Sequence, residues 1–382
     1  MVIPSSPPVK FPQLARGRRE RTRRLLGGAL FFRNGRSALL YSLVQFGLKP
    51  PDVILVPAYY CKSALQSIVA QGFKPVFIDV DRHLNIPLTT LRATLQSFKI
   101  KAVILVHFFG LRSRLREQIL VICQDAGVKV IEDYCHSFLS FGRMQHHESP
   151  EVVAIFSIRK ILPVADGGAA VRGALSGEGS VVNKFDWLSI LRDIFFLITS
   201  LARLLLLRFG KFNPYGRSAE VALRAIRKLG SGGNFGTVGD LTAYPASPGL
   251  LLSGILADAS YLLFASERRR INYAQLADLL SSNGVEVLFP ILSSDDVPQT
   301  LPILDPSGTL HDFLRDMGIG VYRWPGGELP SDVSSRADMF PNSVRMNEVL
   351  VCLPIHQGIA AREISFILQA IVAWRRTITM VQ

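Results

Sequence analysis

The chain of 382 residues is poor in cysteine, has fewer acidic than basic residues, and lacks the pattern of a cleavable leader. Its four cysteines are scattered, without the spacing of a metal site or of a disulfide framework. We therefore expect reduced thiols, no bound metal and a cytoplasmic location. No signal peptide is expected either, because a proline-rich start and then arginines come before any apolar stretch.

The shortage of acid leaves a formal net charge of +13. Much of this charge lies in residues 16–24 and in arginines between 192 and 228. Such clusters attract nucleic acid, anionic lipid or phosphorylated substrates, or they form a solvated tail. No zinc-finger spacing or RNA-binding signature accompanies them, so we do not expect nucleic acid as a partner. A hydrophobic fraction of 48% and a charged fraction of 19% indicate a compact protein, long enough for two domains.

From residue 53 to residue 172, short apolar runs alternate with helix-length segments. The runs predict buried strands at 53–56, 76–78, 102–106, 128–131 and 152–156. The segments between them predict helices at 61–71, 88–97 and 112–126. This alternation predicts an α/β fold with a mainly parallel central sheet covered on both faces. Ligands bind such sheets at the carboxyl ends of the strands, near Tyr59, His107, Asp133 and Ser157.

The segment from Trp187 to Arg208 predicts an amphipathic helix. Its longest charge-free stretch, 194–202, is too short to cross a bilayer, which takes about 20 apolar residues. At ~100° per residue one side is polar and the other apolar. The polar side has Ser189, Arg192, Asp193, Ser200 and Arg203, and the apolar side Leu191, Ile194, Ile198, Leu201 and Leu205. The apolar side either packs against the body or a partner subunit, which is commoner, or lies in a membrane surface.

Two residues point to a chemistry. Asp133 ends the apolar run 128–133, and Lys160 follows the next run, before a turn at 163–168. A carboxylate and a lysine at neighbouring strand ends are what pyridoxal phosphate chemistry requires. The lysine holds the aldehyde as a Schiff base, and the acid keeps the pyridine nitrogen protonated so that the ring can take up electrons.

Several segments occur in the order of a known family. They are Gly35-Arg36-Ser37-Ala38-Leu39, Val56-Pro57-Ala58-Tyr59-Tyr60, Lys74-Pro75-Val76-Phe77-Ile78-Asp79, Val106-His107-Phe108-Phe109-Gly110, Glu267-Arg268-Arg269-Arg270 and Leu353-Pro354-Ile355-His356. Together they resemble the DegT/StrS-type sugar aminotransferase family, which has the aspartate-aminotransferase fold (fold type I). The resemblance spans roughly 30–376 and is absent from about 176 to 238. It implies pyridoxal 5'-phosphate as cofactor and a divergent apolar helical insertion at about 176–238.

The resemblance also implies residue roles. Lys160 and Asp133 are catalytic, and His136 lies near the phenolic oxygen of the cofactor. Gly35, Arg36 and Ser37 precede an apolar helix at 38–46, whose free N–H groups suit the phosphate. Ser157 adds a hydroxyl to the phosphate site, and Tyr60 or Tyr59 stacks on the ring.

The chain departs from the family pattern in three places. Ser157 and Lys160 are three residues apart, where the family has five. The aromatic residue that the family places against the cofactor aligns nearer Cys61. The Asn-Tyr-Arg motif that reaches the neighbouring subunit is replaced by residues 243–248, which puts that cross-subunit contact and the nucleotide-sugar pocket in doubt.

We therefore predict an aminotransferase that moves an amino group from an amino acid to a keto sugar, nucleotide-linked, in polysaccharide or glycan synthesis. The expected organisation is a basic, proline-rich tail (1–28), a large domain (29–262) and a small C-terminal α+β domain (263–382) in a homodimer. The alternatives are a pyridoxal phosphate activity on a non-sugar substrate, or a non-catalytic cofactor-binding protein at a membrane. The altered segment at 243–248 and the apolar helix with its basic neighbours favour these alternatives.

Overall fold

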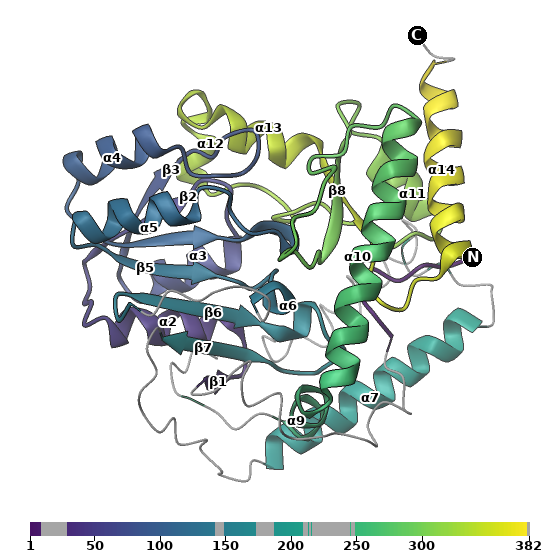
Figure 1. Cartoon of the computed structure of the whole chain (residues 1–382), viewed down its shortest axis with the longest axis horizontal. Helices are drawn as coiled ribbons and strands as arrows, with labels where there is room; N and C mark the ends of the chain where they lie inside the picture. Colours follow the sequence, from purple (N-terminus) through teal and green to yellow (C-terminus); the bar gives the residue numbers. More distant parts are fainter. Residues whose placement is uncertain are drawn as a thin grey trace.

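The computed structural model describes residues 1–8, 29–141, 149–172, 187–208, 213, 215, 245 and 249–379. Within these ranges a seven-stranded sheet has the order β1-β7-β6-β5-β4-β2-β3, and β8 and β9 form a second, two-stranded sheet (Figure 1). The strands are β1 (Leu30–Phe32), β2 (Val53–Pro57), β3 (Lys74–Ile78), β4 (Ile100–Val106), β5 (Lys129–Asp133), β6 (Val152–Ser157), β7 (Gly168–Arg172), β8 (Thr300–Leu304) and β9 (Leu350–Pro354).

Helices precede or follow almost every strand. The α-helices are α2 (Gly35–Gln45), α3 (Lys62–Ala70), α4 (Leu88–Ser97), α5 (Arg116–Asp125), α6 (Phe138–Phe141), α7 (Trp187–Arg208), α9 (Leu250–Ala257), α10 (Ala259–Ser282), α11 (Leu310–Asp316), α12 (Ser331–Ser334), α13 (Pro341–Val349) and α14 (Ala361–Thr379). Three 3₁₀ turns are η2 (Phe108–Gly110), η3 (Ile158–Lys160) and η5 (Ala337–Met339).

The predicted α/β architecture is confirmed. Strands β2 to β6 pair in parallel, and β7 is antiparallel to both of its neighbours. Alternate residues of these strands face opposite layers, because side chains alternate along a strand. Ile54 and Ile104 join the cluster that includes α2 and α3, whereas Leu55 and Val103 join the cluster under α4 and α5. The apolar runs in the sequence therefore form strands that are buried on both faces.

Three strands of this sheet end side by side. The register pairs Val106 with Asp133 and Asp133 with Ile155, so β4, β5 and β6 end at the same edge. The turn η3, with Lys160, follows β6 directly. This register brings Asp133 and the Lys160 turn to one edge of the sheet, as the sequence predicts.

The small sheet packs with α10, α11 and α14 around a second core. Helix α10 belongs to both parts, because Tyr261 packs in a cluster with β6 and Tyr273 packs in the core of the small sheet. The predicted domain boundary at 262/263 falls inside this helix. The predicted tail is described only over residues 1–8, where Ile3 exchanges backbone hydrogen bonds with Gly318 and Gly320.

The apolar segment 250–280 forms two helices separated at Asp258, whose carboxylate accepts a hydrogen bond from the Tyr261 N–H and so begins α10. The orientation of α7 differs from one expectation. Leu191, Ile194, Ile198 and Leu201, on the predicted apolar side, are exposed, so the prediction that this side packs against the body is wrong for the described residues.

Candidate active site

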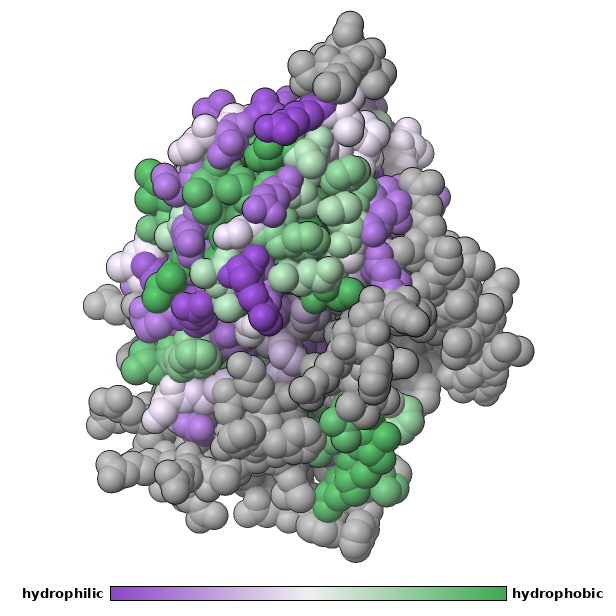
Figure 2. Space-filling model, turned by 90° about the vertical axis from the view of Figure 1, so that its right-hand side faces the viewer, coloured by the Kyte–Doolittle hydropathy of each residue, from purple (hydrophilic) through white to green (hydrophobic). Residues whose placement is uncertain are grey.

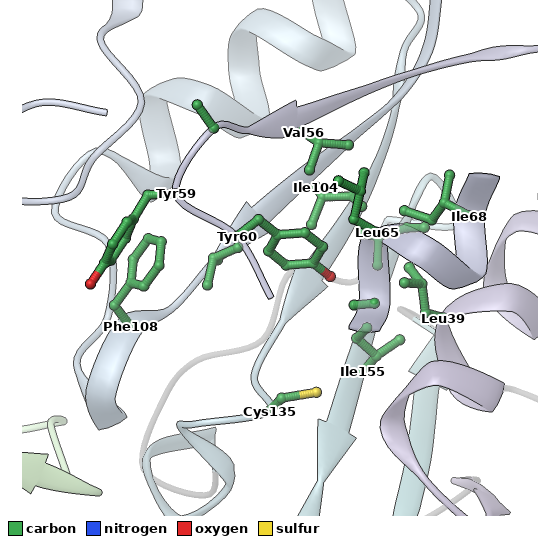
Figure 3. Packing of buried hydrophobic residues seen from close by; sticks show 14 of the residues in the cluster. Leu39, Val56, Tyr59, Tyr60, Leu65, Ile68, Ile104, Phe108, Cys135 and Ile155 are labelled. Atoms are coloured by element: carbon green, nitrogen blue, oxygen red, sulfur yellow. The ribbon is translucent and has the colours of Figure 1, made fainter. Parts of the chain in front are cut away.

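Asp133, the last residue of β5, is buried and accepts two hydrogen bonds. The Tyr60 hydroxyl donates to one carboxylate oxygen at 2.9 Å, and the backbone N–H of Cys135 donates to the other at 2.9 Å. Figure 3 shows Tyr60 and Cys135 in the surrounding apolar core. Burial, and then the negative charge of Asp133, raise the pKa of Tyr60 well above 10, so Tyr60 is a proton donor at neutral pH. Because each carboxylate oxygen can accept more than one hydrogen bond, Asp133 retains capacity for another donor.

Lys160 and His136 form a second pair. The Lys160 Nζ lies 3.2 Å from His136 Nε2. Burial, and then the charge of Lys160, hold the pKa of His136 well below 6.5, so the imidazole is neutral. We assign Nε2 as the acceptor of the hydrogen bond from the Lys160 amine, which places the imidazole proton on Nδ1. That Nδ1 is buried and has no hydrogen-bond partner among the described residues.

Aromatic rings fix the position of His136. Phe109 stacks parallel to the imidazole with its centroid at 5.9 Å, and Trp324 meets the imidazole edge-on at 5.1 Å. Trp324 also accepts a hydrogen bond from the Tyr59 hydroxyl through its carbonyl oxygen. Tyr59 is thus engaged with Trp324 and Phe108, and Tyr60 with Asp133. Stacking of either tyrosine on a cofactor ring stays a prediction.

The start of α2 lies against the same strand ends. An ideal Cβ on Gly35 would come within 2.8 Å of the Cys135 sulfur and 3.3 Å of the Ser157 Cβ, so only glycine fits here without displacement. Asn34, which the sequence analysis missed, caps the helix by accepting hydrogen bonds from the N–H groups of Arg36 and Ser37 at 3.0 and 3.1 Å. The Ser37 hydroxyl is buried, without a hydrogen-bond partner in the described part of the chain.

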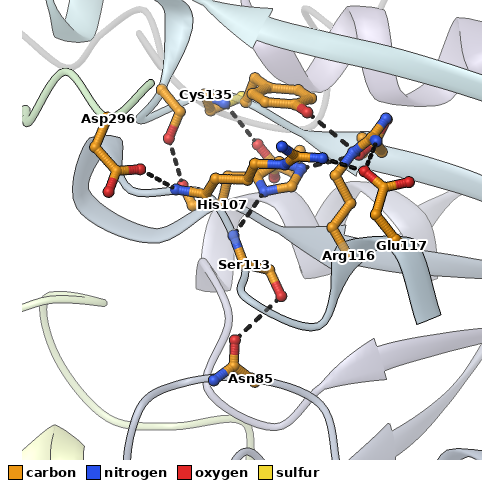
Figure 4. A network of polar contacts seen from close by, with 12 residues as sticks. Asn85, His107, Ser113, Arg116, Glu117, Cys135 and Asp296 are labelled. Carbon is orange, nitrogen blue, oxygen red and sulfur yellow. Dashed lines mark hydrogen bonds and ion pairs between the residues drawn. The ribbon is translucent and has the colours of Figure 1, made fainter. Parts of the chain in front are cut away.

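A network of polar side chains includes Glu132 of β5 (Figure 4). Arg116 pairs with the buried Glu132 carboxylate, which also bonds His107 Nε2 at 3.1 Å. Burial alone would raise the pKa of Glu132, but the hydrogen bonds from His107 and Arg116 lower it to about 2. His107 Nδ1 accepts from the Ser113 N–H at 3.2 Å, so both of its ring nitrogens are engaged. His107 therefore supports the end of β4, although the sequence places it at the ligand-binding edge.

Arg269 is a further residue to which the sequence analysis assigns no role, since residues 267–270 enter it only as part of the family resemblance. Its side chain is buried. It donates to the carbonyls of Ile161 and Gln299 and to the Gln357 side chain, each at 2.9 Å, and to Pro298 at 3.3 Å. Because Ile161 follows Lys160, this guanidinium ties the Lys160 turn to α10, to Gln299 before β8 and to Gln357 after β9.

Comparison with known proteins relates part of the chain to a known family. Residues 27–173 match the family model described as the DegT/DnrJ/EryC1/StrS aminotransferase family. This part of the chain is therefore similar to that family. It includes Asp133, His136 and Lys160 together with the start of α2.

Two curated relatives match part of the chain. Protein MosB of Rhizobium meliloti is 30% identical over 141 residues, which are 36% of this chain and 27% of that protein. The GDP-perosamine synthase of Caulobacter vibrioides is 29% identical over 174 residues, 42% of this chain and 46% of the synthase. The chain thus spans less than half the length of either relative.

Solved structures extend the likeness of fold to the whole chain. The putative sugar aminotransferase Spr1654 of Streptococcus pneumoniae, in its PLP form, superposes with a TM-score of 0.67 at 15% identity. The superposition covers 98% of this chain and 99% of that one. The fold is therefore that of the pyridoxal-phosphate-dependent aminotransferases, as predicted.

The residues present fit pyridoxal phosphate. The cofactor has a ring nitrogen, a phenolic oxygen, an aldehyde and a phosphate. Asp133 suits the ring nitrogen, and the unpartnered His136 Nδ1–H suits an oxygen acceptor. Lys160 suits the aldehyde, and the buried Ser37 hydroxyl at the start of α2 suits the phosphate. Leaving a buried polar group unsatisfied costs about 1–3 kcal/mol, so a ligand that pairs these atoms is favoured.

Proposed function

We propose that the protein is a pyridoxal-phosphate-dependent aminotransferase. The observation that carries the proposal is the contact between Lys160 and the neutral His136, on the segments that follow β5 and β6 beside Asp133. The family match over 27–173 supports it, because that range contains all three residues. When bound, the cofactor supplies an aldehyde for the amine and a ring that takes up the electron pair of the broken C–H bond.

Lys160, Asp133 and His136 have different roles in cofactor binding and proton transfer. Lys160 would hold the cofactor at its aldehyde and would serve as the general base and acid for proton movement at the substrate carbon. Asp133 would pair with the ring nitrogen and keep it protonated, and Tyr60 and the Cys135 N–H hold the Asp133 carboxylate in place. His136 accepts a hydrogen bond from Lys160 and so orients the amine.

Binding of the cofactor phosphate falls to the start of α2. Gly35, Arg36 and Ser37 begin the helix, and Ser157 lies against Gly35. The Asn34 side chain occupies the N–H groups of Arg36 and Ser37 in the described structure. The Asn34 amide is neutral, whereas a phosphate is negatively charged. A phosphate would therefore compete with Asn34 for the same N–H donors, since both its charge and its oxygens suit a helix N-terminus.

The proposed substrates are an amino acid donor and a keto sugar, nucleotide-linked, in polysaccharide or glycan synthesis. The names of relatives support this class: GDP-perosamine synthase, and a UDP-N-acetyl-3-dehydro-alpha-D-glucosamine 3-aminotransferase from Acidithiobacillus ferrooxidans that is 31% identical over 101 residues. We further propose a homodimer in the cytoplasm, with a peripheral contact to the membrane. Residues 243–248, where the sequence departs from the family motif, lie outside the described residues, except Pro245.

Half-reaction spectroscopy tests this function. The cofactor-loaded protein is mixed with one amino acid at a time, and the absorbance change from the pyridoxal to the pyridoxamine form identifies the donor. Keto sugars, free and nucleotide-linked, are then tested for reversal of the change. An aminotransferase responds to at least one donor and one keto acceptor. A protein that binds the cofactor but responds to no amino donor is instead the non-catalytic alternative.

A further inference from the structure

Helix α7 contacts the body through Phe196 and Leu197, which pack against the core cluster that includes α9, and through two polar residues. The buried Asp193 carboxylate accepts a hydrogen bond of 3.0 Å from the Leu251 N–H, at the start of α9, and lies close to Gly249. Arg192 pairs with Asp166, which lies in the turn between Lys160 and β7. The ion pair and the cap together fix which side of α7 faces inward.

The apolar side of α7 consequently faces outward. The exposed fractions are 58% for Leu191, 47% for Ile194, 69% for Phe195, 61% for Ile198 and 45% for Leu201. At ~100° per residue these five positions form one stripe along the helix. Figure 2 shows hydrophobic residues gathered at the lower edge of this side of the molecule, at the height of α7 in Figure 1. A surface helix normally buries such a stripe, whereas α7 leaves these five residues exposed and packs only Phe196 and Leu197 against the body.

The charges around the stripe suit an anionic surface. The only acidic residue in the sequence of α7 is Asp193, which is buried against α9, whereas the helix contains two arginines, Arg203 and Arg208, besides the Arg192 that pairs with Asp166. The whole chain has a net charge of +13. A helix with an apolar stripe in a basic protein binds anionic lipid by combining insertion of side chains with attraction to the headgroups.

Insertion across the bilayer is not an option for the helices described here, none of which is long and apolar enough to span a membrane. We propose that α7 lies flat in the surface of an anionic lipid bilayer, with Leu191, Ile194, Phe195, Ile198 and Leu201 inserted among the lipids. Through Arg192 and Asp166, the bound helix also places the Lys160 turn next to the membrane. The proposal rests on the orientation of α7 and is independent of the aminotransferase activity.

Vesicle sedimentation with the full chain tests the proposal. Vesicles of phosphatidylglycerol and phosphatidylcholine should capture the protein, and vesicles of phosphatidylcholine alone should capture much less. Raising NaCl from about 0.1 M to about 1 M shortens the Debye length from ~10 to ~3 Å and should weaken capture. The double variant Phe195→Asp/Ile198→Asp should reduce the partition coefficient by at least about a hundredfold, since two apolar side chains no longer insert.

A matched control separates insertion from a general effect of added charge. Val121 on α5 is 53% exposed, and α5 lies on the far side of the molecule from α7 in Figure 1. Val121→Asp should bind vesicles like the wild type, and thermal unfolding should show that both variants are folded. If the double aspartate variant unfolds, Phe195→Ser/Ile198→Ser replaces it. A full-length variant with glutamine in place of the arginines in 16–24 measures the part due to the N-terminal segment.

The outcomes separate lipid binding from its rivals. Loss of capture in the α7 variant, but not in Val121→Asp, supports the proposal. Absence of capture by anionic vesicles, or capture that depends only on the arginines of 16–24, overturns it. Analytical ultracentrifugation tests whether the stripe instead binds a second copy of this chain. If the wild type is a dimer and the α7 variant a monomer, while vesicle binding is unchanged, the stripe is a dimer interface and the proposal is wrong.

Discussion

Replacing the buried Arg269 with methionine should destabilise the protein strongly while nearly preserving its volume. The guanidinium donates three hydrogen bonds at 2.9 Å and one at 3.3 Å. Burial lowers the pKa of Arg269 to about 10, which corresponds to a cost of roughly 3 kcal/mol for keeping the charge inside. Each charge-assisted hydrogen bond contributes ~1.5–3 kcal/mol, so the four together exceed that cost. We expect Arg269→Met to lower the free energy of unfolding by about 3–5 kcal/mol.

Arg268, the preceding residue on the same helix, provides the control. It makes one hydrogen bond of 3.3 Å, to the carbonyl of Ile359. Arg268→Met should therefore cost less than about 1 kcal/mol. The assay is urea unfolding followed by tryptophan fluorescence. Equal unfolding free energies for the two variants would refute the reasoning that Arg269 clamps the structure.

A second readout separates positioning from stability alone. Arg269 contacts the carbonyl of Ile161, and the Gln299 side chain contacts the carbonyl of Lys160. Loosening this turn should weaken cofactor binding in Arg269→Met under conditions where the variant is still folded. Arg269→Lys keeps the charge but loses the planar fork, so it should restore only part of the binding. Cofactor affinity equal to that of the wild type in folded Arg269→Met would limit its role to stability.

Three further predictions concern the site. Asp133→Asn should still hold the cofactor on its lysine but should lose about a thousandfold in turnover, because an amide cannot stabilise the protonated ring nitrogen; near-normal turnover would assign that role to another acid. Burial lowers the pKa of His136 and of His107 below 6.5, so at acidic pH the unfolded state binds more protons than the folded state. The free energy of unfolding should therefore fall as the pH drops below about 6.5, by up to ~1.4 kcal/mol per pH unit for each histidine. Urea titrations at several pH values should show that His136→Gln removes the part of this pH dependence that is due to His136. Gly35→Ala should weaken cofactor binding by displacing the start of α2, whereas Gly254→Ala in α9, with open space around it, should stabilise the protein by up to about 1 kcal/mol, and equal effects of the two would contradict the close contact.

The sequence predicted the sheet because its signal is local. Continuous apolar runs such as 102–106 are typical of strands buried on both faces, and the observed strand Ile100–Val106 includes that run. The proximity of Asp133 and the Lys160 turn also followed from pattern, since parallel strands end at a common edge. The hydrogen bond between Lys160 and His136 required coordinates, because the turn η3 sets where the amine lies.

The features that the sequence missed depend on contacts between distant segments. Periodicity shows that α7 has an apolar stripe, but not which side faces the body; Asp193, by capping α9, decides that. Arg269 belongs to a charged run, yet its partners are three backbone carbonyls and the Gln357 side chain, whose positions follow from the packing of segments that are distant in the sequence. Asp258 breaks an apolar segment that periodicity alone would continue.

The central claim is that Lys160 binds pyridoxal phosphate. The most direct measurement is reduction of the cofactor-loaded, full-length protein with borohydride, followed by proteolysis and mass spectrometry. The account predicts a single pyridoxyl modification on Lys160, which Lys160→Ala abolishes. A modification on another lysine, or no modification of the protein after reconstitution with the cofactor, would contradict the account.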